Sequence, residues 1–310
     1  MSFLIPKKPQ ILYAPMLASF GGGSARGFNP GGAGGGPASD VRVTSLPQNL
    51  AAYNLITKTN YGDTYGGSYS TKFNDAGTRF WNVSARASSG SSTPSVYQYE
   101  LATAYDPSSY TSVVSYTTNW SDSYPVTYAD FSRDGAYMFA FSYGTKNVYR
   151  IPLASSFDIT SAPASDQNAS FDFTGSGAAG GGWILSDGSA FITTQRTTDA
   201  WIFPLSTAYD LTTAPSTPTR VDLSSYMTVA PYGGTFFTDS AGDHFWMVGT
   251  RGSALVYSFE LGTSEDLTTI QSVTSRDFGV ESYDAQMTTN SLIFLGAGSS
   301  AAGDVNKFVR

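Results

Sequence analysis

One segment recurs four times along the chain: Val96-Tyr-Gln-Tyr-Glu-Leu-Ala-Thr-Ala-Tyr-Asp106, Val148-Tyr-Arg-Ile-Pro-Leu-Ala-Ser-Ser-Phe-Asp158, Ala200-Trp-Ile-Phe-Pro-Leu-Ser-Thr-Ala-Tyr-Asp210 and Val256-Tyr-Ser-Phe-Glu-Leu-Gly-Thr-Ser-Glu-Asp266. A fifth copy begins at Val305 and runs to Arg310. Successive copies start 52, 52, 56 and 49 residues apart. A period near 50 with several short strands per repeat is typical of a β-propeller blade.

A second unit precedes each copy and consists of a tight turn followed by an aromatic strand. Aspartate and glycine between two apolar runs indicate a hairpin, because glycine adopts the positive φ that such turns require. Each repeat therefore predicts strand, turn, strand, loop, strand, aspartate turn and strand. The turns are Asn74-Asp-Ala-Gly77, Ser132-Arg-Asp-Gly135, Ser186-Asp-Gly188 and Asp239-Ser-Ala-Gly242, with a degenerate copy near Asn290.

The repeats predict an all-β chain whose residues 40–310 form a single propeller of five four-stranded blades. A ring of this kind needs its first and last edges joined, since open strand edges invite pairing with other chains. Residues 40–47 (Asp-Val-Arg-Val-Thr-Ser-Leu-Pro) alternate apolar and polar and have no repeat before them. We expect them to pair with the C-terminal blade as its missing outer strand.

Composition excludes several functions. The 310 residues carry a net charge of −7, whereas a nucleic-acid binder needs a basic face, so we expect no nucleic-acid partner. No apolar run approaches 18 residues, and we expect no membrane insertion. The short apolar stretch 2–6 comes before Lys7 and Lys8, which is not the order of a signal peptide.

The first 39 residues differ from the rest and predict an extended arm. They hold three basic residues and no acid, whereas residues 40–310 hold 14 basic and 24 acidic residues. Residues 21–39 contain nine glycines and cannot build a core. Prolines in the apolar part, residues 3–20, prevent a long helix or a central strand. We expect this arm to bury its apolar side chains on a partner chain through Phe3, Leu4, Ile5, Ile11, Leu12, Tyr13, Pro15, Met16, Leu17, Phe20, Arg26 and Phe28.

The acids that recur in phase with the repeat are expected to be structural. Equivalent positions around a ring have equivalent roles, so an Asx turn explains the four aspartates better than catalysis or a calcium site with single carboxylates. The turns of the second unit resemble the Asp boxes of sialidases, which are structural turns. We predict no catalytic residue, no metal site and no cofactor, and hence no enzyme. The four aspartates are Asp106, Asp158, Asp210 and Asp266.

Residue types that serve metal sites and triads are almost absent. The chain has no cysteine and one histidine, His244, which we interpret as a structural residue on a half-exposed strand. The glycine-rich run lacks the Lys-Ser/Thr ending of a phosphate loop. The tyrosines leave an alternative open, since they favour strands and also stack on sugar rings. Those that we considered for sugar binding are Tyr61, Tyr65, Tyr69, Tyr124 and Tyr128.

The stretch Ile11-Leu-Tyr-Ala-Pro-Met-Leu-Ala-Ser-Phe-Gly-Gly-Gly-Ser-Ala-Arg-Gly-Phe28 resembles the N-terminal anchor on virion-associated proteins of marine tailed bacteriophages. The blade pattern around residues 131–160 is similar to repeats in phage tail and appendage proteins. The resemblance implies a structural protein located in the virion, held by residues 1–39 to tail or capsid subunits. Its propeller would be a tail fibre, appendage or capsid decoration that contacts the host surface. The alternative is a tethered lectin-like propeller that binds host glycans, or a glycan hydrolase.

Overall fold

The fold is described from a computed structural model of the chain. The structure describes residues 41–42, 54–60, 68–84, 95–117, 126–142, 146–163, 169–172, 179–195, 197–239, 241–250, 252–288, 293–296 and 304–309. The chain divides into two units, Met1–Ala33 and Gly34–Arg310, and every described residue belongs to the second. The predicted arm, residues 1–39, lies outside the described residues.

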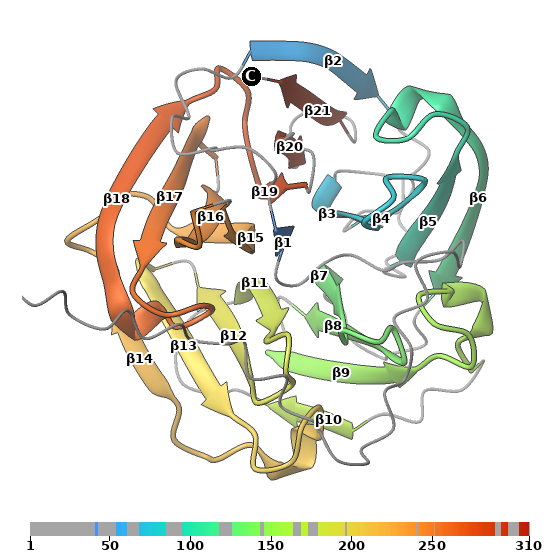
Figure 1. Ribbon diagram of the computed structural model, residues 1–310. Coiled ribbons are helices and arrows are strands. Elements are labelled where there is room, and N and C mark those ends of the chain that lie inside the picture. The colour runs from blue at the N-terminus through green and yellow to red at the C-terminus, as the bar shows by residue number, and fades with distance from the viewer. Residues whose placement is uncertain are drawn as a thin grey trace, which may run out of the picture. The chain divides into compact units, whose positions relative to one another are not determined.

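Five antiparallel sheets stand around one axis and form a five-bladed propeller (Figure 1). The predicted fold class, all-β with four-stranded blades, is confirmed. Blade 1 contains β3 (Ser68–Phe73), β4 (Arg79–Ser84), β5 (Ser95–Leu101) and β6 (Tyr110–Thr117). Blade 2 contains β7 (Val126–Phe131), β8 (Tyr137–Ser142), β9 (Asn147–Pro152) and β10 (Ala169–Asp172).

The other three blades follow the same order from the axis outward. Blade 3 contains β11 (Ala179–Ile184), β12 (Ala190–Gln195), β13 (Asp199–Pro204) and β14 (Thr219–Asp222). Blade 4 contains β15 (Pro231–Thr238), β16 (His244–Thr250), β17 (Leu255–Leu261) and β18 (Ile270–Asp277). Blade 5 contains β19 (Asp284–Met287), β20 (Ile293–Gly296), β21 (Asp304–Val309) and, from the other end of the chain, β2 (Asn54–Asn60).

The strand that completes blade 5 is β2, and the expectation that residues 40–47 do so is wrong. Asn54 pairs with Val309 and Asn60 with Asp304 in antiparallel register. Of the predicted strand, Val41–Arg42 forms β1, which pairs in parallel with Phe237 and Thr238 of β15 in blade 4. A strand from the N-terminal side of the ring does join its two ends, but it lies further along the chain than residues 40–47, whose alternating apolar and polar side chains predicted the strand.

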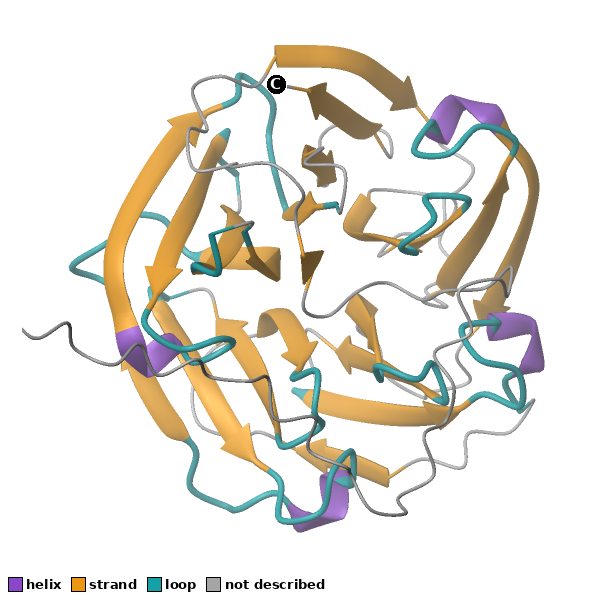
Figure 2. Cartoon of the chain, in the orientation of Figure 1, coloured by secondary structure: helices purple, strands orange, loops and turns teal. Residues whose placement is uncertain are grey.

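Short 3-10 helices lie at the periphery of four blades, each in the segment between the third strand and the outermost strand (Figure 2). We call the segment between the third and fourth strands of a blade its outer turn, and the segment between the first and second strands its inner turn. The two turns lie at the same end of a blade because antiparallel strands alternate in direction. The 3-10 helices are η2 (Pro107–Ser109), η3 (Ile159–Ser161), η4 (Leu211–Thr213) and η5 (Leu267–Thr269).

Aromatic side chains fill the seams between blades. Trp81 of blade 1 packs on Phe131 of blade 2 with ring centroids 4.8 Å apart. Phe73 of blade 1 lies 4.2 Å from Phe294 of blade 5. These two seams therefore bury large apolar groups from both neighbouring blades, and burial of one such side chain contributes about 1.5–3 kcal/mol.

The inner turn and the outer turn of a blade also pack on each other. In blade 2 the Phe157 N–H donates to the Gly135 carbonyl at 3.0 Å, and both residues have positive φ, 57° and 69°. A Cβ added at Gly135 would overlap the ring of Phe157, so the ring requires glycine opposite it. In blade 4 the outer turn has Glu265 at the aromatic position, and a Cβ at Gly242 would have no described neighbour within 4 Å.

This difference predicts that Gly135→Ala destabilises the protein more than Gly242→Ala. Both substitutions put an L-residue at positive φ, 69° and 93° respectively, which costs about 1 kcal/mol. Only Gly135→Ala also displaces an aromatic ring, for an additional loss of about 1–3 kcal/mol. Equilibrium unfolding in urea measures both changes, and equal losses for the two variants would contradict the packing described here.

Candidate functional site

A buried polar cluster lies at the axis of the ring and takes one strand from every blade. We call it the axial cluster. The innermost strands contribute charged and hydrogen-bonding groups that point toward one another. Its members are Lys72 from β3, Tyr128 and Asp130 from β7, Trp183 from β11, the Gly234 carbonyl from β15 and Asp284 from β19.

The Gly234 carbonyl oxygen accepts three hydrogen bonds. Lys72 Nζ donates to it at 3.0 Å, the Tyr128 hydroxyl at 2.8 Å and Trp183 Nε1 at 2.7 Å. The Lys72 ammonium also lies 5.1 Å from the centroid of the Tyr128 ring, within cation–π range. Side chains from blades 1, 2 and 3 are thereby joined to one backbone atom of blade 4.

Two carboxylates extend the axial cluster by accepting backbone N–H groups from neighbouring blades. Asp284 Oδ2 of blade 5 accepts from the Thr71 N–H of blade 1 at 2.6 Å. Asp130 Oδ2 of blade 2 accepts from the Ile184 N–H of blade 3 at 3.1 Å. Gln286 of blade 5 adds a bond from the Phe73 N–H to its Oε1 at 2.9 Å. These bonds cross two seams of the ring, including the seam between the last blade and the first.

Burial controls the ionisation of these carboxylates. Burial raises the pKa of Asp284 to about 7, against the opposing effects of the Lys72 charge and of hydrogen bonds from Thr71 and Ala285. Burial likewise raises the pKa of Asp130, again opposed by Lys72 and two N–H donors. The pKa of Tyr128 is raised well above its ordinary value by burial and by the two carboxylates. The positive charge of Lys72 therefore offsets part of the free-energy cost of burying these two carboxylates.

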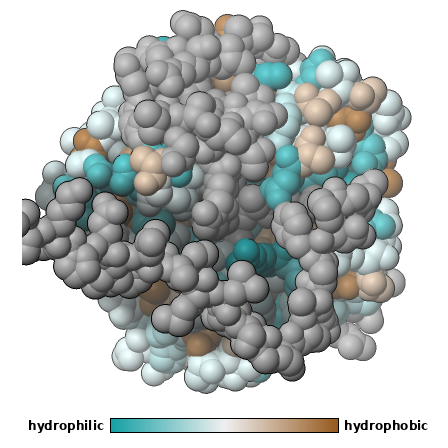
Figure 3. Space-filling view, in the orientation of Figure 1, coloured by the Kyte–Doolittle hydropathy of each residue, from teal (hydrophilic) through white to brown (hydrophobic). Residues whose placement is uncertain are grey.

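The axial cluster is enclosed. Lys72 and Asp130 are each 5% exposed and Asp284 is 1% exposed. Where the described residues are visible on the face drawn in Figure 3, hydrophilic residues lie near the middle and hydrophobic ones are scattered. Their hydrogen bonds to neighbouring strands hold the blades together.

The four repeated aspartates cap the outer turns, as the sequence predicts. Asp158 Oδ1 accepts from the N–H and the hydroxyl of Thr160 at 3.0 and 2.7 Å. Asp106, Asp210 and Asp266 make the same pair of bonds with Ser108, Thr212 and Thr268. Burial acts to raise the pKa of Asp158, but these hydrogen bonds outweigh it and lower that pKa. The four aspartates lie one per blade around the rim, and the structure does not bring them together.

The other candidate residues from the sequence are the single histidine, the tyrosines and the residues of the arm. His244 is partly buried, and its Nδ1 lies 2.9 Å from Thr238 Oγ1 within blade 4, in keeping with a structural role. Tyr128 is fully buried and cannot stack on a sugar, so that interpretation is wrong for it. The side chains of the other four tyrosines, and all the predicted anchor residues from Phe3 to Phe28, lie outside the described residues. In the described ranges, no three His, Asp or Glu side chains cluster as metal ligands would.

The axial cluster was not predicted from the sequence. Lys72, Asp130 and Trp183 each lie two residues before the start of an inner turn, on the first strand of a repeat. A charged residue near the end of the first strand, as at Lys72 and Asp130, is a usable signal, because that strand lies innermost in a propeller blade. The partners could not be recognised from spacing, since they come from five different repeats.

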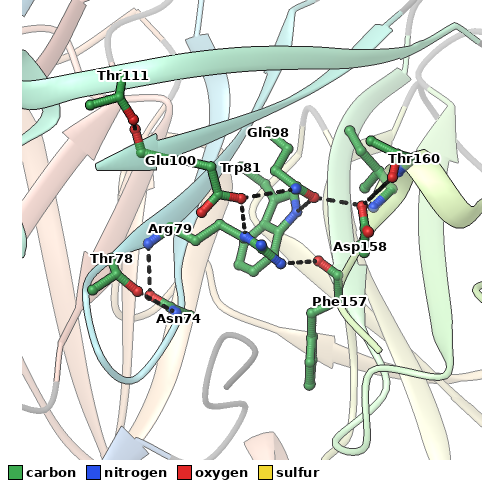
Figure 4. Close-up of polar contacts among 11 residues, drawn as sticks. Asn74, Thr78, Arg79, Trp81, Gln98, Glu100, Thr111, Phe157, Asp158 and Thr160 are labelled. Carbon is green, nitrogen blue, oxygen red and sulfur yellow. Dashed lines mark hydrogen bonds and ion pairs between the residues drawn. The ribbon is translucent and has the colours of Figure 1, made fainter. Parts of the chain in front are cut away.

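A second polar group lies at the seam between blades 1 and 2 (Figure 4). Arg79 Nε pairs with Glu100 Oε1 at 2.6 Å, and Arg79 Nη1 donates to the Phe157 carbonyl in the outer turn of blade 2 at 3.2 Å. Gln98 Oε1 accepts from Trp81 Nε1 and from the Ile159 N–H, both at 3.1 Å. The face of blade 1 thus receives the outer turn of blade 2.

Neither a protein-family model nor a curated protein matches the chain. Among solved structures, the chain is similar to the β-propeller domain of Cps50 (Swd1) from Myceliophteria thermophila. The identity is 11% and the TM-score 0.43, with 83% of this chain and 99% of that chain covered. In the described part of the chain, no helix is long and apolar enough to cross a membrane.

The axial cluster predicts that stability falls as the pH rises from about 4 to about 7. Asp284 has a folded-state pKa of about 7 against 3.8 ordinarily, so the folded chain holds a proton that the unfolded chain has lost in this range. One such proton changes the free energy of unfolding by up to about 1.4 kcal/mol per pH unit, and the dependence disappears above pH 7. Asp130 acts in the same direction, because its pKa is also raised.

Asp284→Asn isolates the contribution of this group. The amide oxygen can still accept the Thr71 N–H, and the amide has no proton that titrates in this range. Unfolding by urea at several pH values should show a flatter profile for the variant than for the wild type. An unchanged slope would show that Asp284 does not bind the proton.

Proposed function

We propose that this protein is a structural component of a tailed-bacteriophage virion and has no enzymatic activity. In this proposal the propeller is a rigid head, carried on a tail fibre, appendage or capsid decoration. Residues 1–39 attach it to tail or capsid subunits. The proposal covers the location, the virion, and the partners, which are other virion proteins.

The observation that supports a structural role most directly is the enclosed axial cluster. Propellers offer a ligand site where their innermost strands converge, because side chains from every blade meet there. In this ring that position is filled by Lys72, Tyr128 and Trp183 on the Gly234 carbonyl. Groups that could perform acid–base chemistry, Asp130 and Asp284, are at most 5% exposed.

The arm supports attachment through its composition. It carries a charge of +3 and a concentration of apolar side chains between prolines, and the propeller portion, residues 40–310, carries −10. The resemblance of residues 11–28 to phage anchor peptides points to the same use. The alternative, a glycan-binding or glycan-cleaving propeller, loses one of its proposed stacking residues because Tyr128 is buried.

Attachment predicts that a chain lacking residues 1–39 is left out of virions. The experiment assembles phage particles with this variant and measures whether it copurifies with them. The expected result is loss of incorporation, with the β-sheet circular dichroism signal of the soluble ring unchanged. Incorporation at the wild-type level would show that the propeller itself docks and would overturn the anchor.

Full-length variants provide a matched control for the deletion. Leu12→Asp with Leu17→Asp puts charges where the arm is expected to bury apolar groups and should prevent incorporation. Ser24→Asp places one charge in the glycine-rich part and should leave it nearly unchanged. Equal incorporation of both variants would count against apolar docking of residues 3–20.

A further inference from the structure

Outer turns do more than connect strands, because each packs on the blade that precedes its own. The outer turn of blade 2 is received by blade 1 through Arg79, whose Nη1 donates to the Phe157 carbonyl (Figure 4). Arg150 of blade 2 donates to the Tyr209 carbonyl of blade 3 at 2.8 Å. Lys307 of blade 5 donates to the Tyr105 carbonyl of blade 1 at 2.9 Å. The same packing thus recurs at several seams.

The outer turn of blade 4 also packs on the preceding blade, but it does so through a glutamate side chain instead of a backbone carbonyl. Glu265 of this turn accepts from the Ser186 N–H at 3.0 Å and from its hydroxyl at 2.8 Å, in the inner turn of blade 3. Leu267, the next apolar residue, is buried. Blades 1, 2, 3 and 5 therefore each contact the outer turn of a neighbouring blade. We call the surface that makes this contact the receiving face of a blade. For blade 4, the described residues include no outer turn on this face.

Strand register identifies that face. Glu260 pairs with Ser272 as Glu100 pairs with Ser112, and Ser258 pairs with Thr274 as Gln98 pairs with Val114. Ser258 and Glu260 thus occupy the positions of Gln98 and Glu100, which receive a turn in blade 1. A hollow of about 270 Å³ lies over them, lined by Asp243, Phe245, Ser258, Glu260, Ser272 and Thr274.

By the same pattern, the segment that corresponds to these outer turns in blade 5 is the one before its fourth strand. That strand is β2, so the corresponding segment directly precedes Asn54 and lies outside the described residues. Its sequence is Asn49-Leu-Ala-Ala-Tyr53, which aligns with Asp106-Pro-Ser-Ser-Tyr110 and Asp266-Leu-Thr-Thr-Ile270. An Asx residue, an apolar residue and two small residues stand before the outer strand in all three.

We propose that residues 49–53 of this chain occupy the hollow on blade 4, with Leu50 in the place that Ile159 takes on blade 1. Both the position in the chain and the sequence favour this occupant over a second copy or a foreign peptide. The segment is joined to β2, whose partner strand β21 belongs to the blade next to blade 4.

Charge complementarity supports the same occupant. Where the receiving face carries arginine, the outer turn carries aspartate: Arg150 lies 3.9 Å from Asp210, and the charge of Arg79 helps to lower the pKa of Asp158. The hollow on blade 4 has two acids, Asp243 and Glu260, in its lining. The aspartate is replaced there by Asn49, which keeps the hydrogen-bonding oxygen of an Asx turn without a negative charge.

Cysteine cross-linking tests the placement, because the full-length chain contains no cysteine of its own. The test variant is Leu50→Cys with Ser258→Cys, treated with a short bis-maleimide. The positive control is Ile159→Cys with Gln98→Cys, at positions that touch in the structure. The negative control pairs Leu50→Cys with Ser112→Cys, on the blade 1 strand β6.

The expected result is an intramolecular cross-link in the test variant that forms at a rate similar to the positive control. It should form about tenfold or more faster than in the negative control, because adjacent thiols react at high effective concentration. A cross-link found only between chains would show that a second copy fills the hollow. A rate equal to the negative control would overturn the placement.

A charge variant provides an independent test. Asn49→Asp should lower the melting temperature by about 2–4 °C, since it places a third carboxylate beside Asp243 and Glu260. Adding Glu260→Gln should restore most of this loss. Strictly additive effects of the two substitutions would show that residue 49 lies away from the hollow.

Discussion

At the axis of the ring, the carbonyl oxygen of Gly234 accepts hydrogen bonds from the Lys72 ammonium, the Tyr128 hydroxyl and the Trp183 indole. The donors belong to three blades and the acceptor to a fourth. Each polar group is buried, so removing one leaves its partners without water to replace it, at a cost of about 1–3 kcal/mol per group. The blades are consequently coupled, and we expect the ring to unfold as one cooperative unit.

The charges of the axial cluster explain why this arrangement specifies one structure. A lysine in the interior requires nearby negative charge, and Asp130 and Asp284 supply it from blades 2 and 5. These carboxylates also accept backbone N–H groups of blades 3 and 1. A ring with a different number of blades, or with blades shifted along the axis, would leave these groups unpaired. The apolar seams, in contrast, tolerate many similar packings.

The sequence was sufficient for the repeat, the number of blades and the turns, because these depend on residues close together in the chain. Asp158 and Gly135 illustrate this, since their roles follow from hydrogen bonds and φ values set within a few residues. The strand that completes blade 5 was misplaced for a physical reason. Outermost strands are largely exposed and polar, as in β18, so β2 carries little hydrophobic signal to distinguish it from residues 40–47. The axial cluster could not be predicted because its members meet only when five strands converge.

The pairing of β2 with β21 has a consequence for how the chain is made. Asn54 leaves the ribosome long before its partner, Val309, has been synthesised. Blades 1 to 4 can each form from consecutive residues as they emerge, but blade 5 is incomplete until residues 304–309 have been synthesised. During that interval β2 lacks its partner strand, and its edge remains open to other strands, including those of neighbouring nascent chains. The rate of elongation between β2 and β21 should therefore influence how much of this protein reaches the native ring.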